Sequence, residues 1–155
     1  MKKLFLYVLL KAVALGGSSC ASVKKAPEVQ PMKLTEFSAE SEKSGFDAAS
    51  RFADGFASAV KSGDFSAWQK EMPPHIRSKV SAAEFKRMRG ELHSLFGNMS
   101  SARYLGTLRK GDLRDHLWAV SFEKDGKVNE VVYLVRVYCS ENGLPEISGF
   151  GVRRF

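Results

Sequence analysis

Residues that build metal, disulfide and catalytic sites are scarce in this 155-residue chain, which contains only two cysteines and three histidines. His75 and His93 have no second metal-ligating side chain at a useful spacing, so we expect no metal site. No Gly-x-Ser-x-Gly motif is present, and the glycines at 149 and 151 lead into a strand rather than into the helix that a phosphate-binding loop requires. The sequence therefore predicts no catalytic residue and no cofactor.

Long apolar runs are absent too, and the run from Leu4 to Leu10 is interrupted by Lys11. A spanning helix needs about 20 consecutive apolar residues, so this stretch is too short to cross a membrane. It follows Lys2 and Lys3 and ends in the small residues 16–21, which is the composition of a secretory leader. The sequence predicts a signal peptide at residues 1–19.

Cys20 follows the small residues Ser18 and Ser19, and this junction resembles the lipobox of bacterial lipoproteins, with Gly17 where those boxes usually carry leucine. The resemblance implies that Cys20 becomes the first residue and carries a lipid that anchors the protein to a membrane. The protein would then be exported to the cell envelope and held on the periplasmic side, in the outer membrane where a cell has two, because Ala21 is not aspartate. Cleavage after Ala21 without lipid, or no cleavage, are the alternatives.

The chain is basic, with 24 Lys and Arg against 17 Asp and Glu and a net charge of +7. Removal of the leader takes three lysines with it and leaves 21 basic and 17 acidic residues, a net charge of +4. An exported protein with this small excess is not expected to meet nucleic acid, and weak attraction to anionic envelope surfaces fits better. The basic cluster at 86–89 is interpreted as the solvated face of a helix.

Residues 20–44 are predicted to form a lipidated cysteine and a flexible tether, because they are rich in Lys, Glu, Ser and Pro and have no apolar period. Residues 45–155 then make one globular domain. Cys139 continues an alternating apolar run and is predicted to be a buried core residue. A disulfide to Cys20 is open only if Cys20 is not lipidated.

Three helices are predicted in the first half of the domain. Phenylalanines and alanines at three- and four-residue spacing place the first helix from Phe46 to a C-cap at Gly63. Asp64 is the expected N-cap of a short second helix, which the prolines at 73–74 end. Ser81 and Glu84 form a capping box that opens the third helix, which ends at residue 97.

The second half has a period of two and predicts an antiparallel meander of about four strands. The Asp125-Gly126 turn sets the register, because it pairs Lys124 with Lys127 and places Trp118 opposite Tyr133 and Val120 opposite Val131. The strands are expected at 102–109, 116–124, along the β-branched run 131–139, and at 147–155.

Two segments resemble the nuclear transport factor 2-like (cystatin-like) fold: the corner Ser62-Gly63-Asp64-Phe65 and the ending at 142–150, where Leu144 replaces a frequent tryptophan. The resemblance implies an α+β domain of three helices packed on a strongly curved sheet, shaped like a cone. It is closest to small exported lipoproteins with no assigned function, so it implies no reaction.

Polar and aromatic side chains within the strands form the candidate pocket, in which Arg136 would bind an anionic group and aromatic rings would supply the wall. The alternative is a snorkelling arginine on a solvated face and ordinary aromatic core packing. The candidate pocket residues are Arg136, Trp118, Tyr133, Tyr104 and Tyr138.

The leading functional prediction is a non-enzymatic envelope lipoprotein domain that binds a second copy, an envelope protein or a ligand through its sheet or cone. A module for an apolar or anionic small molecule is the alternative, and an isomerase- or dehydratase-like enzyme ranks last. An enzyme of that kind needs a titrating pair in the cone, whereas His116 is expected at a strand end with Asp115 on the opposite face.

Overall fold

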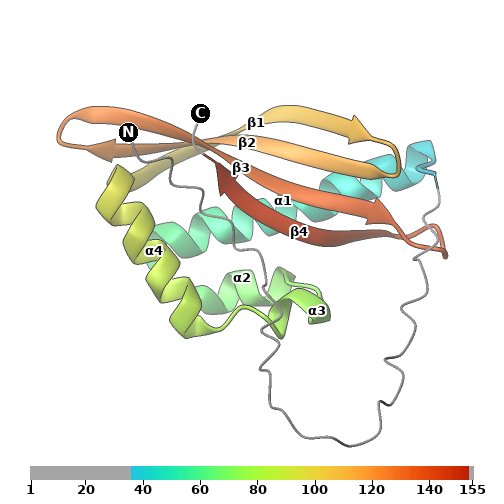
Figure 1. Cartoon of the computed structure of the whole chain (residues 1–155), viewed down its shortest axis with the longest axis horizontal. Coiled ribbons are helices and arrows are strands. Elements are labelled where there is room, and N and C mark those ends of the chain that lie inside the picture. The colour runs from blue at the N-terminus through green and yellow to red at the C-terminus, as the bar shows by residue number, and fades with distance from the viewer. Residues whose placement is uncertain (1–35, 154–155) are drawn as a thin grey trace, which may run out of the picture.

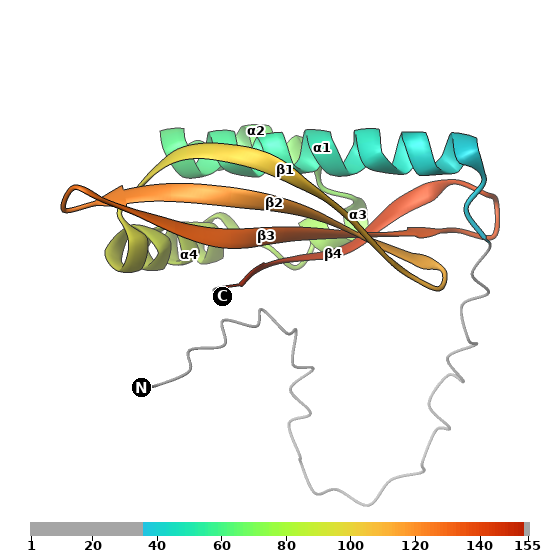
Figure 2. The same cartoon turned by 90° about the horizontal axis from the view of Figure 1, so that it is seen from above.

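The computed structural model describes residues 36–153 as helices packed on one four-stranded antiparallel sheet (Figure 1). The strands follow one another in the order β1-β2-β3-β4, and the predicted α+β class is confirmed. The elements are α1 (Ala39–Ser62), α2 (Phe65–Glu71), α3 (Pro74–Arg77), α4 (Ala82–Phe96), β1 (Asn98–Lys110), β2 (Leu113–Lys124), β3 (Lys127–Cys139) and β4 (Pro145–Arg153). Figure 2 shows α1 lying along one face of the twisted sheet.

The predicted signal peptide and Cys20 lie outside the described residues. Within residues 36–153, no helix combines the length and the apolar character that crossing a membrane requires.

Helix α1 begins at Ala39, so residues 39–44 are helical and the predicted end of the tether at 44 is wrong. Ser38 caps the helix, because its side chain accepts a hydrogen bond from the amide of Ser41. Glu40 and Glu42 lie in the first turn, where a negative charge is favoured. These polar residues were assigned to the tether because they add nothing to the apolar stripe.

The other helix ends follow the predicted capping signals. Gly63 is a left-handed C-cap, and the side chain of Asp64 accepts from the amide of Ser66 at the start of α2. The predicted capping box at the start of α4 is present, with Ser81 and Glu84 bonding to each other's backbone. The short α3 was not predicted; it has a proline in its first turn, where the missing amide costs nothing.

The predicted register of the central hairpin is confirmed. Trp118 pairs with Tyr133, Val120 with Val131, and Lys124 with Lys127. Strand β1 is longer than predicted and contains two irregularities, between residues 99 and 101 and between 104 and 106. Bulges of this kind bend a strand and increase its twist.

The core lies between α1 and the inner face of the sheet. Phe52 and Phe56 of α1 are almost fully buried there, with Trp68 of α2 and Tyr133 of β3. The prediction that Cys139 is buried is also confirmed, since it is 1% exposed. The core is therefore rich in aromatic rings, and α1 contributes two of them.

Gly97 joins α4 to β1, and a substitution there tests how closely this junction packs against β2. Its φ of 96° is a glycine conformation, and a Cβ there would lie 2.0 Å from the carbonyl oxygen of Glu123. We expect Gly97→Ala to lower the free energy of unfolding in urea by at least about 2 kcal/mol, through backbone strain and this clash.

Gly90 is the matched control on the same helix, because nothing lies within 4 Å of its Cβ position. Gly90→Ala should stabilise the protein by about 0.5 to 1 kcal/mol through helix propensity. Equal effects of the two substitutions would contradict the packing of α4 against the β2–β3 hairpin.

Candidate functional site

The sheet separates the five residues that the sequence grouped in one pocket. Trp118, Tyr133 and Tyr104 lie on the inner face, where the Tyr133 ring stacks on an α1 phenylalanine with centroids 4.2 Å apart. Arg136 and Tyr138 occupy the alternate positions of β3 and point to the outer face. The predicted single pocket is therefore wrong, because successive residues of a strand alternate between faces.

Arg136 is held by an acidic residue of this chain. Its Nε and Nη2 donate to the two oxygens of Asp115 at 2.6 and 2.9 Å, and Lys110 Nζ donates to the same carboxylate at 3.0 Å. Burial alone would raise the pKa of Asp115, but the hydrogen bonds from Arg136 and Lys110 outweigh it and lower that pKa below its usual value. The anion that Arg136 binds in this structure is thus the carboxylate of Asp115.

Tyr138, on the same outer face, donates its phenolic hydrogen to Glu146 at 2.7 Å. This hydrogen bond raises the pKa of Tyr138 to about 12. Neither outer-face candidate contributes to a site with the aromatic residues of the inner face.

His116 lies inside β2 and is 2% exposed, so the prediction of a strand-end residue is wrong. Its Nδ1 lies 2.9 Å from Thr107 Oγ1 and 3.4 Å from the hydroxyl of Tyr104, and those two hydroxyls are 2.6 Å apart. Phe46 of α1 packs beside the imidazole ring. Asp115 lies on the opposite face, as predicted. Burial lowers the pKa of His116, so a neutral imidazole sits beside two hydroxyl groups.

One ion pair fixes the start of α1 over this cluster. Arg114, which is 8% exposed, donates from Nε to Glu42 Oε1 at 2.7 Å and packs its guanidinium 4.4 Å from the centre of the Phe37 ring. Arg109 approaches the same Glu42 oxygen at 3.7 Å. The sequence does not predict this cluster, because Glu42 lies in the segment expected to be the tether.

Two polar atoms in the aromatic interior have no partner. Among residues 36–153, Trp68 Nε1 and the Tyr133 hydroxyl are the buried side-chain nitrogen and oxygen atoms without a hydrogen bond. Both rings contact Phe56 and Phe150, so they belong to one aromatic cluster. Burial raises the pKa of Tyr133 well above its usual value, so the hydroxyl keeps its proton and can donate it.

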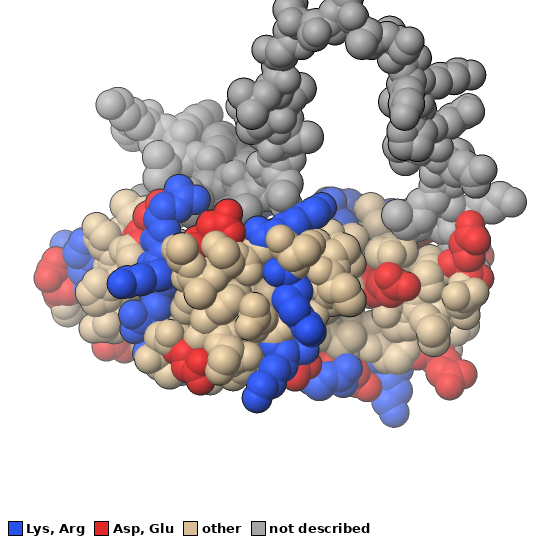
Figure 3. Space-filling model, turned by 90° about the horizontal axis from the view of Figure 1, so that it is seen from below, with Lys and Arg blue, Asp and Glu red and all other residues tan. Residues whose placement is uncertain are grey.

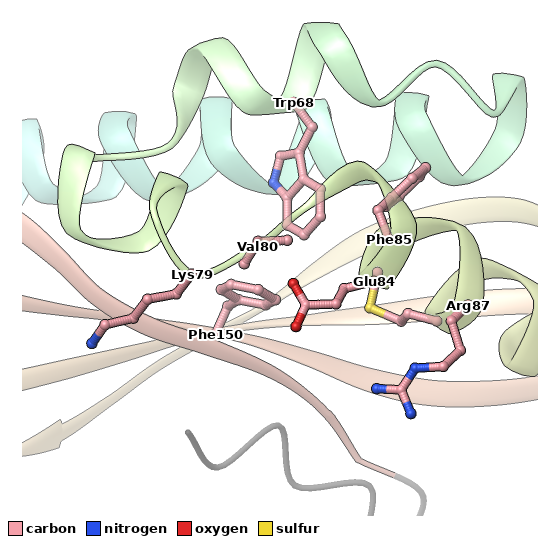
Figure 4. Close-up of a pocket in the computed structure, with 8 residues that line it drawn as sticks. Trp68, Lys79, Val80, Glu84, Phe85, Arg87 and Phe150 are labelled. Carbon is pink, nitrogen blue, oxygen red and sulfur yellow. The ribbon is translucent and has the colours of Figure 1, made fainter. Parts of the chain in front are cut away.

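A small cleft opens beside this cluster, where α2, α4 and β4 meet. Its volume is about 50 Å³, and Trp68, Phe85 and Phe150 line it with Val80 and Met88. Figure 4 shows the indole of Trp68 reaching from its helix toward Phe150, with Glu84 and Arg87 projecting from α4. This volume is far below the roughly 300 Å³ of a small ligand pocket, so the cleft has room for one small group of a ligand and not for a whole drug-sized molecule.

Trp68 lies in α2 and Phe150 in β4, in the helix and strand that the sequence predicts for them. The sequence alone does not bring the two residues together in one site. Trp68 is 0% exposed, and an indole in that position needs an acceptor for its N–H. The signal available in the sequence was a tryptophan on the apolar stripe of α2 with no obvious acceptor beside it.

Charge on the helical side is mixed. Figure 3 shows lysines and arginines in bands with acidic residues beside them, rather than as one block. Arg87 pairs with Glu91 at 3.8 Å on the exposed face of α4. The predicted solvated face is confirmed, because Lys86, Arg87 and Arg89 are all exposed, and Arg89 also donates a hydrogen bond to α1.

No protein-family model matches this chain, and no curated protein matches it. Similar solved structures include a variant of IdmH and Bd1075. A loop-truncation variant of IdmH gives a TM-score of 0.39 at 16% identity, covering 67% of this chain and 90% of that chain. Bd1075 from Bdellovibrio bacteriovorus gives 0.42 at 14% identity, covering 76% of this chain and 43% of that chain, so the match spans less than half of that protein. At these values the likeness concerns the arrangement of helices and strands.

The buried His116 predicts a pH dependence of stability. Its pKa is lower in the folded state than the ordinary value of 6.5, so its contribution is present above that value and is lost as the pH falls through the folded pKa. We expect the free energy of unfolding in urea to fall between about pH 7.5 and about pH 5.5, and His116→Asn to remove that slope while keeping a polar atom near Nδ1.

His93, exposed on α4, is the matched control, and His93→Asn should leave the slope unchanged. The carboxylates with lowered pKa values titrate at lower pH and lie outside this window. A slope that persists in His116→Asn would contradict the assignment.

Proposed function

We propose that this chain is an exported lipoprotein whose domain, of the nuclear transport factor 2-like kind, is a non-enzymatic binding module for a small, mainly apolar ligand. The observation that carries the proposal is an unpartnered donor, Trp68 Nε1, on a residue that lines the cleft. The Tyr133 hydroxyl is a second unpartnered donor in the same aromatic cluster, but Tyr133 does not line the cleft. A ligand with an apolar end and one hydrogen-bond acceptor fits that chemistry.

Without a ligand, the unpartnered donors lower the stability of the aromatic core. A buried polar group without a partner costs about 1 to 3 kcal/mol, and phenylalanine in place of either residue would avoid that cost. A bound acceptor satisfies the donor and removes the cost. An ordered water would also accept a hydrogen bond from the donor, so the experiment has to distinguish a bound water from a bound ligand.

The envelope part of the proposal comes from the sequence. The leader and Cys20 favour an anchored protein, and the domain begins at Ala39, a short stretch of chain after the anchor. Its partners would be the membrane through the lipid, and a small ligand, a second copy or an envelope protein through the domain. Nucleic acid is not among them.

A second candidate, protein docking through the outer sheet face, has its own supporting observation. Gly149 and Gly151 lie on this face without a positive φ and with open space at their Cβ positions, so neither backbone nor packing in this chain requires glycine there. Leu117 and Leu134 pair beside them, and Leu108 is 49% exposed. Glycine in a strand often marks the close approach of another chain.

An enzyme remains the third candidate. Acid-base chemistry would use the cluster of His116, Thr107 and Tyr104 at the start of α1, where the imidazole can exchange a proton with a hydroxyl. Activity of this kind would be abolished by His116→Asn, whereas ligand binding at the Trp68 cleft would persist.

The ligand proposal can be tested with Trp68 as its own reporter, because the chain has two tryptophans and Trp118→Phe leaves Trp68 alone. In that background, cyclopentanone should quench Trp68 fluorescence saturably. Methylenecyclopentane has the same shape and no acceptor. After each affinity is corrected for the free energy of transferring the probe out of water, it should bind about tenfold more weakly for the loss of one satisfied hydrogen bond. Equal corrected affinities, or no saturable quenching, would overturn the proposal.

Tyr133→Phe supplies the second measurement. Without ligand it should raise the free energy of unfolding by about 1 kcal/mol, because an unsatisfied hydroxyl is removed. A Tyr133→Phe protein that is less stable would indicate that the hydroxyl is satisfied by a buried water.

The anchor can be tested by mass spectrometry of the full-length protein extracted in mild detergent from a bacterial host. We expect a mass that lacks residues 1–19 and carries acyl groups, and Cys20→Ser should remove the acyl mass. An unlipidated chain beginning at Ser22 would exclude the anchor and leave a secreted domain.

A further inference from the structure

A second and larger crevice lies at the far end of α1, between the end of that helix, the last turns of α4 and the start of β1. Its volume is about 280 Å³, and Lys61, Arg89, His93 and Asn98 line it together with Val60 and Met99. None of its lining residues is acidic. We propose that this crevice binds the phosphate group of a small phosphorylated molecule or of a lipid headgroup.

The basic side chains of Lys61 and Arg89 both donate hydrogen bonds to backbone carbonyls. Arg89 Nε donates to the carbonyl of Val60 at 2.7 Å, and Lys61 Nζ donates to the carbonyl of Ser100 at 2.8 Å. These contacts connect α4 to α1 and α1 to β1. Both side chains are thereby ordered before any ligand arrives, which reduces the entropy that binding would cost.

Most of their hydrogen-bonding capacity is unused. A lysine ammonium has three donors and an arginine guanidinium has five. Lys61 uses one, and Arg89 uses Nε and a long contact of 3.5 Å from Nη2 to the carbonyl of Lys61. A phosphate oxygen in the crevice can therefore accept hydrogen bonds from both groups without breaking an existing contact.

The charge of these cations is also not neutralised by acidic residues. Within residues 36–153, the ion pairs of the molecule involve other basic side chains, and neither Lys61 nor Arg89 has a carboxylate within 4 Å. The Val60 and Lys61 carbonyls that Arg89 contacts carry only the partial charge of a helix end, and the Ser100 carbonyl that Lys61 contacts is a neutral strand group. Net positive charge therefore remains in the crevice.

Arginine and lysine side by side favour phosphate over a neutral ligand, because the planar fork of arginine can bind two oxygens while lysine adds a point charge. The Asn98 side chain offers an amide donor at the rim. Val60 and Met99 give the crevice an apolar side that suits a short carbon chain attached to the phosphate.

The test measures binding of glycerol 3-phosphate and of inorganic phosphate to the full chain carrying Cys20→Ser, by isothermal titration calorimetry at low salt. We expect saturable binding that the double variant Lys61→Gln with Arg89→Gln weakens by at least about tenfold. The matched control is Lys86→Gln with Lys127→Gln, which removes the same charge from two exposed side chains and should leave the affinity within about twofold.

Arg89→Lys keeps the positive charge and removes the planar guanidinium group. It should therefore weaken binding by a factor between those of the unchanged protein and Arg89→Gln, and it remains informative even if Arg89→Gln disturbs the helix packing. Thermal melting of each variant identifies loss of fold. If the two double variants weaken binding equally, the proposal is overturned, because the affinity would then depend on the net charge of the protein and not on the two crevice side chains.

A vesicle-binding measurement with the same protein variants distinguishes a lipid headgroup from a free phosphorylated molecule. Binding to phosphatidylglycerol vesicles in excess of phosphatidylcholine vesicles, lost in the crevice variant and kept in the control, assigns a lipid headgroup. Binding of glycerol 3-phosphate without that difference assigns a free phosphorylated molecule. Absence of saturable binding in both arms overturns the site.

Discussion

The packing of the α1 aromatic stripe on the inner face of the sheet is the contact on which the other features of the domain depend. Phe52 and Phe56 are buried against Trp68 and Tyr133, and the stack of Phe56 on Tyr133 has nearly parallel rings. Because α1 is one continuous helix, this contact fixes both of its ends. The first turns then cover His116, and the last turn forms one wall of the basic crevice.

The alternation of side chains across the sheet determines which chemistry each face can support. The inner face holds aromatic rings and the neutral imidazole, whereas the outer face holds the ion pair between Asp115 and Arg136 beside exposed leucines. The charged pair therefore cannot serve as the acid or base for a ligand in the interior. In the proposed function, the inner side would take a small apolar molecule and the outer face would be the surface for another protein.

Local signals in the sequence determined much of this structure in advance. The Asp125-Gly126 turn and the alternating pattern predict the register of β2 and β3, and that same register places Asp115 opposite Arg136, so the ion pair was within reach of sequence reasoning. The contact of Arg89 with the α1 carbonyl and the position of Trp68 beside Phe150 were not. They depend on how separate elements pack, which neither periodicity nor turn chemistry encodes.

The two proposed sites stand in a definite relation to the anchor. With 24 residues, α1 separates its first turn from the crevice by about 36 Å. In the proposed lipoprotein, the 18 residues between Cys20 and Ala39 have a maximum reach of roughly 60 Å. That reach exceeds the length of α1, so the covalent geometry lets either end of the helix approach the membrane that holds the lipid. If the anchor is present, a phospholipid headgroup is therefore within reach of Arg89 and Lys61, and the choice between a headgroup and a free phosphate depends on the chemistry attached to the phosphate.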